Sequence, residues 1–313
     1  LLLEAEGVTY GFDLIYGLPE DNYAGFKASI DAALHFSPNH LHIFPLSVLP
    51  GTRLAEQTEA LGIKAQSEPP YQLLSSNNWS AAELEKCHKL TCAIDIFYNT
   101  GRAVAFFPAI QNALSIEPSQ LFEDFYAWME QQPDIAATAI TEAALWQADD
   151  AYRLIQGYLC HRLKDAGLSH LSSIFLDLLC YHFHYAETLL GEELLPPPQS
   201  DLEKIDFWET PWKRSEQLRL VPFAYEILDL LEMEGMQLDE FADLFRPVGS
   251  VALFMRRDSE VFCESLGEDM QRLLKESNGQ LSPKQIFGGS LSKETGCELV
   301  EFAAFEGLLQ LAD

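Results

Sequence analysis

The chain has 313 residues, of which 48% are hydrophobic and 12% aromatic, so it can bury a sizeable core and is not a disordered chain. Its net charge of −28 at pH 7 repels phosphate backbones, and no local cluster of lysine and arginine offsets it, which argues against nucleic-acid binding. No apolar run is long enough to span a bilayer and no signal-peptide pattern is present, so we expect no membrane partner. Six scattered cysteines predict reduced, mostly buried thiols, as in a cytoplasmic protein.

The N-terminal part of the chain predicts a strand–helix–strand unit. Residues 8–16 are rich in β-branched and aromatic residues and stop at the turn signal of residues 17–19. Residues 23–34 repeat apolar side chains at helical spacing. The nearly continuous apolar run of residues 41–49 then predicts a strand buried on both faces, ending at a Pro-Gly turn that leads into another helix. Strands joined through a helix pair in parallel, so the loops after both strands are the candidate site.

Two motifs in this unit resemble those of a known enzyme family. The run Asp13-Leu14-Ile15-Tyr16-Gly17-Leu18-Pro19-Glu20 resembles the fifth-strand motif of radical S-adenosylmethionine (SAM) enzymes. The run His42-Ile43-Phe44-Pro45-Leu46, followed by Leu49-Pro50-Gly51-Thr52-Arg53-Leu54, resembles the sixth strand and its turn. The nearest group has an upstream cobalamin-binding domain and includes magnesium-protoporphyrin oxidative cyclases and Fe-S oxidoreductases. Oxygen-independent coproporphyrinogen oxidases share both turns.

The resemblance implies half of a SAM site, with backbone from both strand ends flanking the adenosyl moiety and apolar side chains covering its ring. The residues implied are Ile15, Gly17, Leu18, Glu20, Ile43, Phe44 and Leu46. It also implies reductive cleavage of SAM by a [4Fe-4S] cluster, with or without cobalamin, on an unknown substrate. A structural role alone is the alternative for each residue: Gly17 for a tight turn, and Glu20 as a first-turn carboxylate beside the helix dipole.

The cluster motif of the family, Cys-x-x-x-Cys-x-x-Cys, is not present. None of the six cysteines forms a set of three with that spacing, and we predict no catalytic residue and no metal ligand within these 313 residues. Residues 1–7 predict the last turn of a helix closed by a C-cap glycine. We therefore expect the C-terminal region of a larger radical SAM enzyme, whose N-terminal domains carry the cluster. The alternative is a non-catalytic region that binds a substrate or partner.

A helix is predicted from the capping box Ser80-x-x-Glu83 to Gly101, packed beside the strands. It carries Cys87 and Cys92, which lie five positions apart and so do not share a helix face as a metal-binding pair would. The simpler interpretation is that both are ordinary thiols.

The segment 106–195 is predicted to be a helical domain, with helices over 119–129, 141–163 and 169–190. The cluster Cys180-Tyr-His182-Phe-His184 suggests a metal site, but positions 180 and 184 share a helix face that position 182 does not. Core and boundary side chains are the favoured interpretation.

Pro196-Pro197-Pro198 predicts a linker. Beyond it we expect a strand near 218–227, a hairpin over 251–263, and helices over 268–275, from Ser282, and over 294–310. This pattern resembles the winged-helix-like modules that bind a peptide leader in peptide-modifying radical SAM proteins. A structural cap on the helical domain is the alternative.

The sequence thus predicts a mixed α/β chain, mostly α, in three domains. A truncated (β/α) radical-SAM barrel remnant covers residues 1–105, a helical domain covers 106–195, and a small α+β module, winged-helix-like at its end, covers 201–313. The strand over 8–16 is expected to lack a neighbour on one side. We predict that its edge is covered by the helix of residues 80–101 or by a homodimer contact.

Overall fold

The computed structural model describes residues 8–232 and 236–312, so the predicted helix end at residues 1–7 lies outside the described residues. The fold is mixed α/β and mostly α, which confirms the predicted class, and within the described ranges its strands form small sheets and no closed barrel. Two compact units, Leu1–Phe175 and Leu176–Asp313, divide the chain. The three-domain division with boundaries near 105 and 195–200 stays a prediction.

The first unit is organised around a parallel pair of strands. Strand β1 (Gly11–Tyr16) pairs with β2 (His40–Pro45), and α2 (Tyr23–Leu34) connects them. The Asn22 side chain caps α2 by accepting backbone hydrogen bonds at 3.0 and 3.1 Å. The predicted strand–helix–strand unit is confirmed, although β1 begins at Gly11 rather than at residue 8.

Past the second strand, the chain forms the short helix α3 (Arg53–Glu56) and an antiparallel hairpin of β3 (Lys64–Ala65) and β4 (Leu73–Ser75). Helix α4 (Ala81–Ile94) begins with the predicted Ser80–Glu83 capping box and continues as a π-helical turn, Asp95–Thr100. The remaining α-helices of this unit are α5 (Phe107–Leu114), α6 (Pro118–Met129), α7 (Ala137–Thr141) and α8 (Ala148–Asp165). Short 3₁₀ turns cover Ala103–Ala105, Ala143–Leu145 and Ser169–Leu171.

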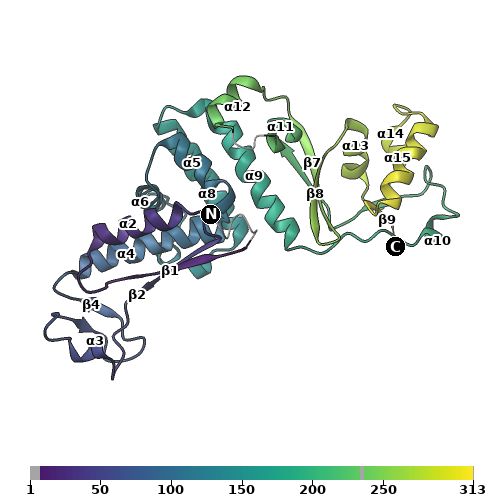
Figure 1. The fold of residues 1–313 in the computed structure, drawn as a ribbon. Helices are drawn as coiled ribbons and strands as arrows, with labels where there is room; N and C mark the ends of the chain where they lie inside the picture. Colours follow the sequence, from purple (N-terminus) through teal and green to yellow (C-terminus); the bar gives the residue numbers. More distant parts are fainter. Residues whose placement is uncertain (1–7, 233–235, 313) are drawn as a thin grey trace. The chain divides into compact units, whose positions relative to one another are not determined.

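Helices α2 and α4 lie side by side on one face of the β1–β2 pair (Figure 1). Strand β2 therefore alternates: Leu41 and Ile43 are buried against the helices, whereas His42 and Phe44 are exposed. The expectation of a strand buried on both faces is wrong, because in the described residues the helices cover only one side. Behind α4, an aromatic core forms around Phe97, whose ring meets those of Phe122, Phe125 and Tyr158 edge-on.

The second unit contains a three-stranded antiparallel sheet of β6 (Arg219–Phe223), β7 (Ser250–Arg257) and β8 (Glu260–Ser265). A separate pair joins β5 (Trp212–Arg214) to β9 (Leu309–Leu311). Its helices are the 176–189 part of α9 (Ser172–Leu189), α10 (Gln199–Leu202), α11 (Ile227–Leu231), α12 (Leu238–Leu244), α13 (Glu268–Glu276), α14 (Pro283–Phe287) and α15 (Lys293–Phe305).

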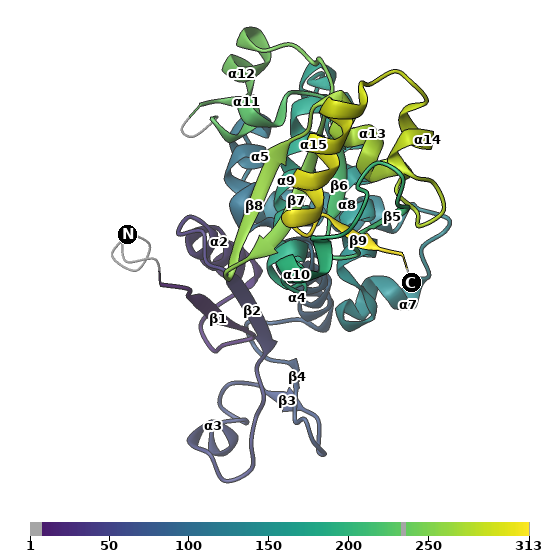
Figure 2. The same cartoon turned by 90° about the vertical axis from the view of Figure 1, so that its right-hand side faces the viewer.

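Helix α9 and the three C-terminal helices pack with this sheet (Figures 1 and 2). Phe254 of β7 contacts Tyr181 of α9, and the buried Asp177 carboxylate accepts the backbone N–H groups of Ala224 and Tyr225 at 3.0 and 2.8 Å. Leu253, the next residue along β7, joins the core formed by α13, α14 and α15. The alternation along β7 thus places the sheet between two helical layers.

The predicted hairpin and the Ser282 capping box are both present. The prediction that the last helix continues to residue 310 is wrong, because α15 ends at Phe305 and Leu309–Leu311 pairs with β5. Strand β6 is shorter than predicted and ends at Phe223. No helix in the described residues has the length and apolar character needed to cross a membrane.

Candidate functional site

The two strands of the first unit end side by side, and this brings their following turns together. Tyr16 lies opposite Pro45 in the register, and the Leu46 N–H donates to the Tyr16 carbonyl at 2.9 Å. Gly17 follows with φ +92°, a conformation that side chains rarely adopt. A Cβ there would also lie 2.9 Å from a methyl group of Leu73, so both backbone shape and space require glycine.

The predicted site residues do not all face one way. Ile15 and Phe44 are directly paired in the register and lie on the open face of the sheet, with 45% and 50% of their surface exposed. Ile43 and Leu46 are buried, and Leu46 is the neighbour that a Cβ on Gly17 would touch at 3.3 Å. The structure therefore brings together an exposed apolar pair and a buried support beneath it.

Leu18 and Glu20 lie in the loop after β1, and both are exposed. The Leu18 carbonyl accepts a hydrogen bond from the buried Trp79 indole at 2.9 Å, which fixes the loop to the segment before α4. Glu20 has φ +67°.

The open face carries a polar group beside this apolar pair. Asp13 and His42 are paired in the register, with 3.4 Å between Oδ1 and Nδ1, and the His42 ring stacks on that of His40. Because side chains alternate along a strand, Asp13 and His42 lie on the same face as Ile15 and Phe44. This face carries a carboxylate, two imidazoles and an apolar pair over three register positions, Gly11–His40, Asp13–His42 and Ile15–Phe44.

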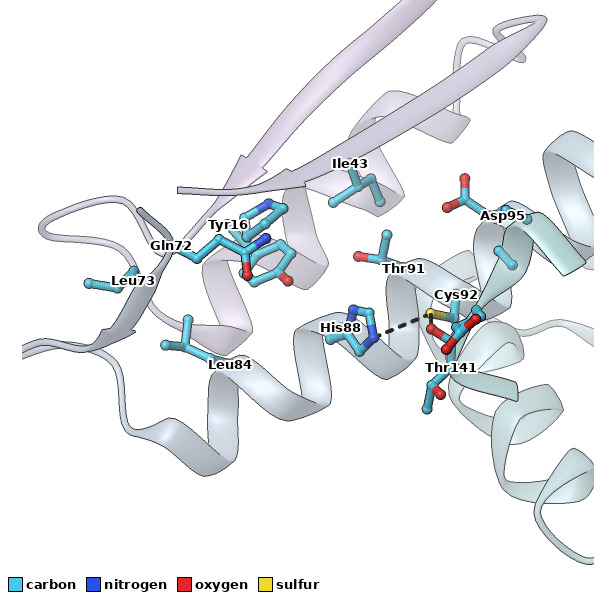
Figure 3. A pocket seen from close by; sticks show the side chains of 14 residues that line it. Tyr16, Ile43, Gln72, Leu73, Leu84, His88, Thr91, Cys92, Asp95 and Thr141 are labelled. Carbon is cyan, nitrogen blue, oxygen red and sulfur yellow. Dashed lines mark hydrogen bonds between the residues drawn. The ribbon is translucent and has the colours of Figure 1, made fainter. Parts of the chain in front are cut away.

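A cavity of about 610 Å³ lies on the opposite, helical side of the same strands (Figure 3). Its walls are the ends of β1 and β2, the segment before β4, one face of α4, and residues 141–144. The side chains with hydroxyl, amide, imidazole or carboxyl groups that line it are those of Tyr16, Gln72, His88, Thr91, Asp95, Thr141 and Glu142. Sequence reasoning missed this cavity. The available signal was the set His88, Thr91 and Asp95, which places polar side chains at helical spacing on a helix face that is otherwise apolar.

The Cys92 thiol lines this cavity and the Cys87 thiol lies on the same helix, and burial makes both poor nucleophiles. Burial raises the pKa of Cys87 to about 12, and burial with the nearby Asp95 raises that of Cys92 to about 11. Both thiols are therefore protonated near neutral pH, and the thiolate is the reactive and metal-binding form. The Cys92 sulfur lies 3.8 Å from His88 Nε2 and 3.3 Å from the Thr141 carbonyl. Both cysteines are free and buried.

The cysteines of the chain do not fit an iron–sulfur cluster. Cys160 is exposed, Cys180, Cys263 and Cys297 are half-buried, and across residues 8–232 and 236–312 no three His, Cys, Asp or Glu side chains come together as metal ligands. His182 of the predicted Cys180–His184 cluster is half-buried, and burial lowers its pKa to about 4.

Comparison with known proteins adds one result. Residues 59–189 match a family described as "Protein of unknown function (DUF4080)". This domain is found in cobalamin-binding radical SAM proteins. No curated protein matches the chain. The matched segment begins after the two strand-end turns and includes α4, the cavity-lining residues 141–144, and α8.

Proposed function

We propose that this chain is the C-terminal region of a cytoplasmic radical SAM enzyme that cleaves SAM reductively, with or without cobalamin, and acts on a substrate of unknown class. The observation that supports this most is the pairing of the two motif-bearing strands, whose turns lie side by side at one end of a parallel pair. The family match adds support, because it covers the segment that directly follows these turns in a domain found in cobalamin-binding radical SAM proteins.

In this proposal Ile15 and Phe44 cover the adenine ring of SAM, and the backbone from Gly17 to Leu18 lies at the edge of the site. The exposed apolar pair fits that role, because a ring binds best against apolar side chains with polar groups at its rim. Gly17 keeps the turn close to Leu46 and Leu73, and the Trp79 indole holds the Leu18 carbonyl in place. When bound, SAM supplies the sulfonium bond that is cleaved.

The [4Fe-4S] cluster is assigned to residues outside these 313. No three cysteines of the described residues come together as ligands for a cluster. The proposal therefore requires an in-frame Cys-x-x-x-Cys-x-x-Cys motif upstream in the same gene.

Two experiments test this requirement. The gene is sequenced upstream, and the extended protein and the present chain are both purified. After anaerobic reconstitution, we expect iron, sulfide and 5′-deoxyadenosine formation with the extended protein, and no cluster on the chain alone. An upstream frame without the cysteine motif, or a stoichiometric cluster on this chain, would contradict the proposal.

The SAM contacts can be tested in the extended protein. Phe44→Ala and Ile15→Ala should each weaken SAM binding about tenfold, because each removes apolar cover from the ring. Phe12→Ala is the matched control: Phe12 lies on the same strand and is 36% exposed, but it pairs with Leu41 rather than with Phe44. Equal losses from all three substitutions would show general damage to the strands rather than a ligand contact.

The alternative is a non-catalytic region that binds a substrate or partner. It would be favoured if the extended protein, reconstituted with a cluster, bound SAM with unchanged affinity in both the Ile15→Ala and the Phe44→Ala variants.

A further inference from the structure

The cavity beneath β1 and β2 is elongated along α4. Its helical wall is formed by Leu84, His88, Thr91 and Asp95, which recur at intervals of three or four residues and therefore share one face of the helix. At 1.5 Å per residue, the eleven-residue interval from Leu84 to Asp95 spans about 16 Å. Figure 3 shows Tyr16, Gln72 and Leu84 toward one end and Asp95 toward the other. A ligand of this cavity is thus a chain rather than a compact ring system.

One end of the cavity presents hydrogen-bonding groups that the protein does not use. The Tyr16 side chain is 5% exposed, and its hydroxyl has no hydrogen-bond partner among the described residues. The Gln72 side-chain amide also makes no hydrogen bond within those residues, although its backbone pairs with Gln66. Both side chains line the cavity, so their polar groups are open to water or to a ligand group there.

The other end is acidic. Asp95 Oδ1 accepts a hydrogen bond from Asn99 at 2.7 Å, which leaves its second oxygen available, and Glu142 also lines the cavity. No lysine or arginine is among the lining residues. Burial raises the pKa of the Asp95 carboxyl, and an adjacent cation would offset that cost. An anion would meet two carboxylates without a compensating positive charge.

We propose that this cavity binds an elongated small-molecule amine. Its ammonium group lies at Asp95, its apolar chain runs along Ile43 and Leu84, and a hydroxyl or carbonyl group at its far end meets Tyr16 and Gln72. This inference is independent of the proposed SAM chemistry, because the cavity lies on the helical side of the strands and the Ile15–Phe44 pair lies on the open side.

Three probes that differ only at one end separate the effect of the ligand's charge from that of its chain and hydroxyl. 6-Aminohexan-1-ol, hexane-1,6-diol and 6-hydroxyhexanoate share a six-carbon chain and one hydroxyl, and carry a positive, neutral or negative second end. Calorimetric titration into the purified chain should show binding at least tenfold tighter for the amino alcohol than for the diol, and weakest binding for the carboxylate. Equal affinity for all three, or no saturable binding of the amino alcohol up to millimolar concentration, would overturn the proposal.

Variants locate the two ends. Asp95→Asn should reduce the affinity for the amino alcohol at least fivefold and leave that for the diol unchanged. Tyr16→Phe should weaken the amino alcohol and the diol alike, but not hexylamine, which lacks the hydroxyl. Glu85→Gln is the control, since Glu85 lies on an exposed part of α4 outside the cavity. Circular dichroism confirms folding of each variant. A loss from Glu85→Gln as large as that from Asp95→Asn would show a general charge effect and contradict the assignment.

Discussion

Gly17 and Gly51 share a backbone conformation but differ in their surroundings. Both have positive φ, at +92° and +79°, but a Cβ on Gly17 would crowd Leu73 and Leu46, whereas one on Gly51 would meet nothing within 4 Å. We expect Gly51→Ala to reduce the free energy of unfolding by about 1 kcal/mol, the usual cost of the conformation alone. Gly17→Ala should cost about 2 kcal/mol more, because it also forces core side chains to move. Urea denaturation measures both, and equal losses would mean that the first turn relaxes freely.

His182 should make the second unit sensitive to mild acid. Burial lowers its pKa to about 4 in the folded protein, whereas an unfolded histidine titrates near 6.5. Between these values the unfolded state binds more protons, so stability is complete above about pH 6.5 and falls as the pH drops toward 4. The loss amounts to about 3 kcal/mol.

The variant His182→Gln isolates this contribution. Burial raises the pKa of the Asp177 carboxyl, which acts in the opposite direction, so the wild-type curve alone contains both effects. The wild type should lose stability relative to the variant as the pH falls from 6.5 to 4. Parallel pH curves for the two proteins would contradict the assignment.

At the scale of elements, the Asn99 side chain hydrogen-bonds to the backbone of β2. Asn99 accepts the Leu41 N–H at 3.1 Å and donates to the Leu41 carbonyl at 2.9 Å, as a neighbouring strand would. Asn99→Ala should cost about 2–3 kcal/mol in unfolding free energy, because it leaves both backbone groups unpaired. Asn112→Ala, at an exposed site on α5, is the control and should change stability by less than about 0.5 kcal/mol. A loss no larger than the control would show that water replaces the amide.

Local sequence signals predicted the elements whose determinants are close together. The first strand–helix–strand unit, the Ser80–Glu83 box and the β7–β8 hairpin each depend on residues within one short segment. The β5–β9 pair joins residues about a hundred positions apart, and neither three-residue strand has a pattern of its own. The exposure of Phe44 depends on what covers the sheet, which the apolar run could not reveal. Five separate segments form the cavity, so only the polar residues at helical spacing on α4 could have indicated it from the sequence.

Strand β1 has one paired side and one side without a strand partner among the described residues. Helix α4 packs under β2 on the buried face of the pair. An uncovered edge invites strand addition, while the large negative charge opposes non-specific association, so we expect a symmetric dimer contact at this edge.

Hydrogen exchange on residues 11–16 across a dilution series checks this expectation. Protection that falls on dilution would confirm the dimer. Protection that does not depend on concentration would show that the chain itself covers the edge. Rapid exchange at every concentration would contradict the parallel pair itself.

For the whole molecule, the negative net charge decides whether it can bind DNA. The net charge is −28, and α15, which would be the recognition helix of a winged-helix module, carries Glu294, Glu298 and Glu301. Phosphate contacts need lysine or arginine, so generic duplex DNA should show no electrophoretic shift with this protein at moderate salt. A basic DNA-binding protein in the same gel is the control, and a shift that salt abolishes would contradict the expectation.

The fold depends on the number of residues in the π-helical turn Asp95–Thr100, and not only on their identity. A π turn contains one residue more than the α-helical turn that would otherwise end α4. Deleting one residue there would restore regular helix and rotate everything downstream by about 100° relative to α4. Asn99 would then point away from Leu41, although Asp95 would still face the cavity. Natural relatives with this fold should therefore vary in composition across this segment but keep its length.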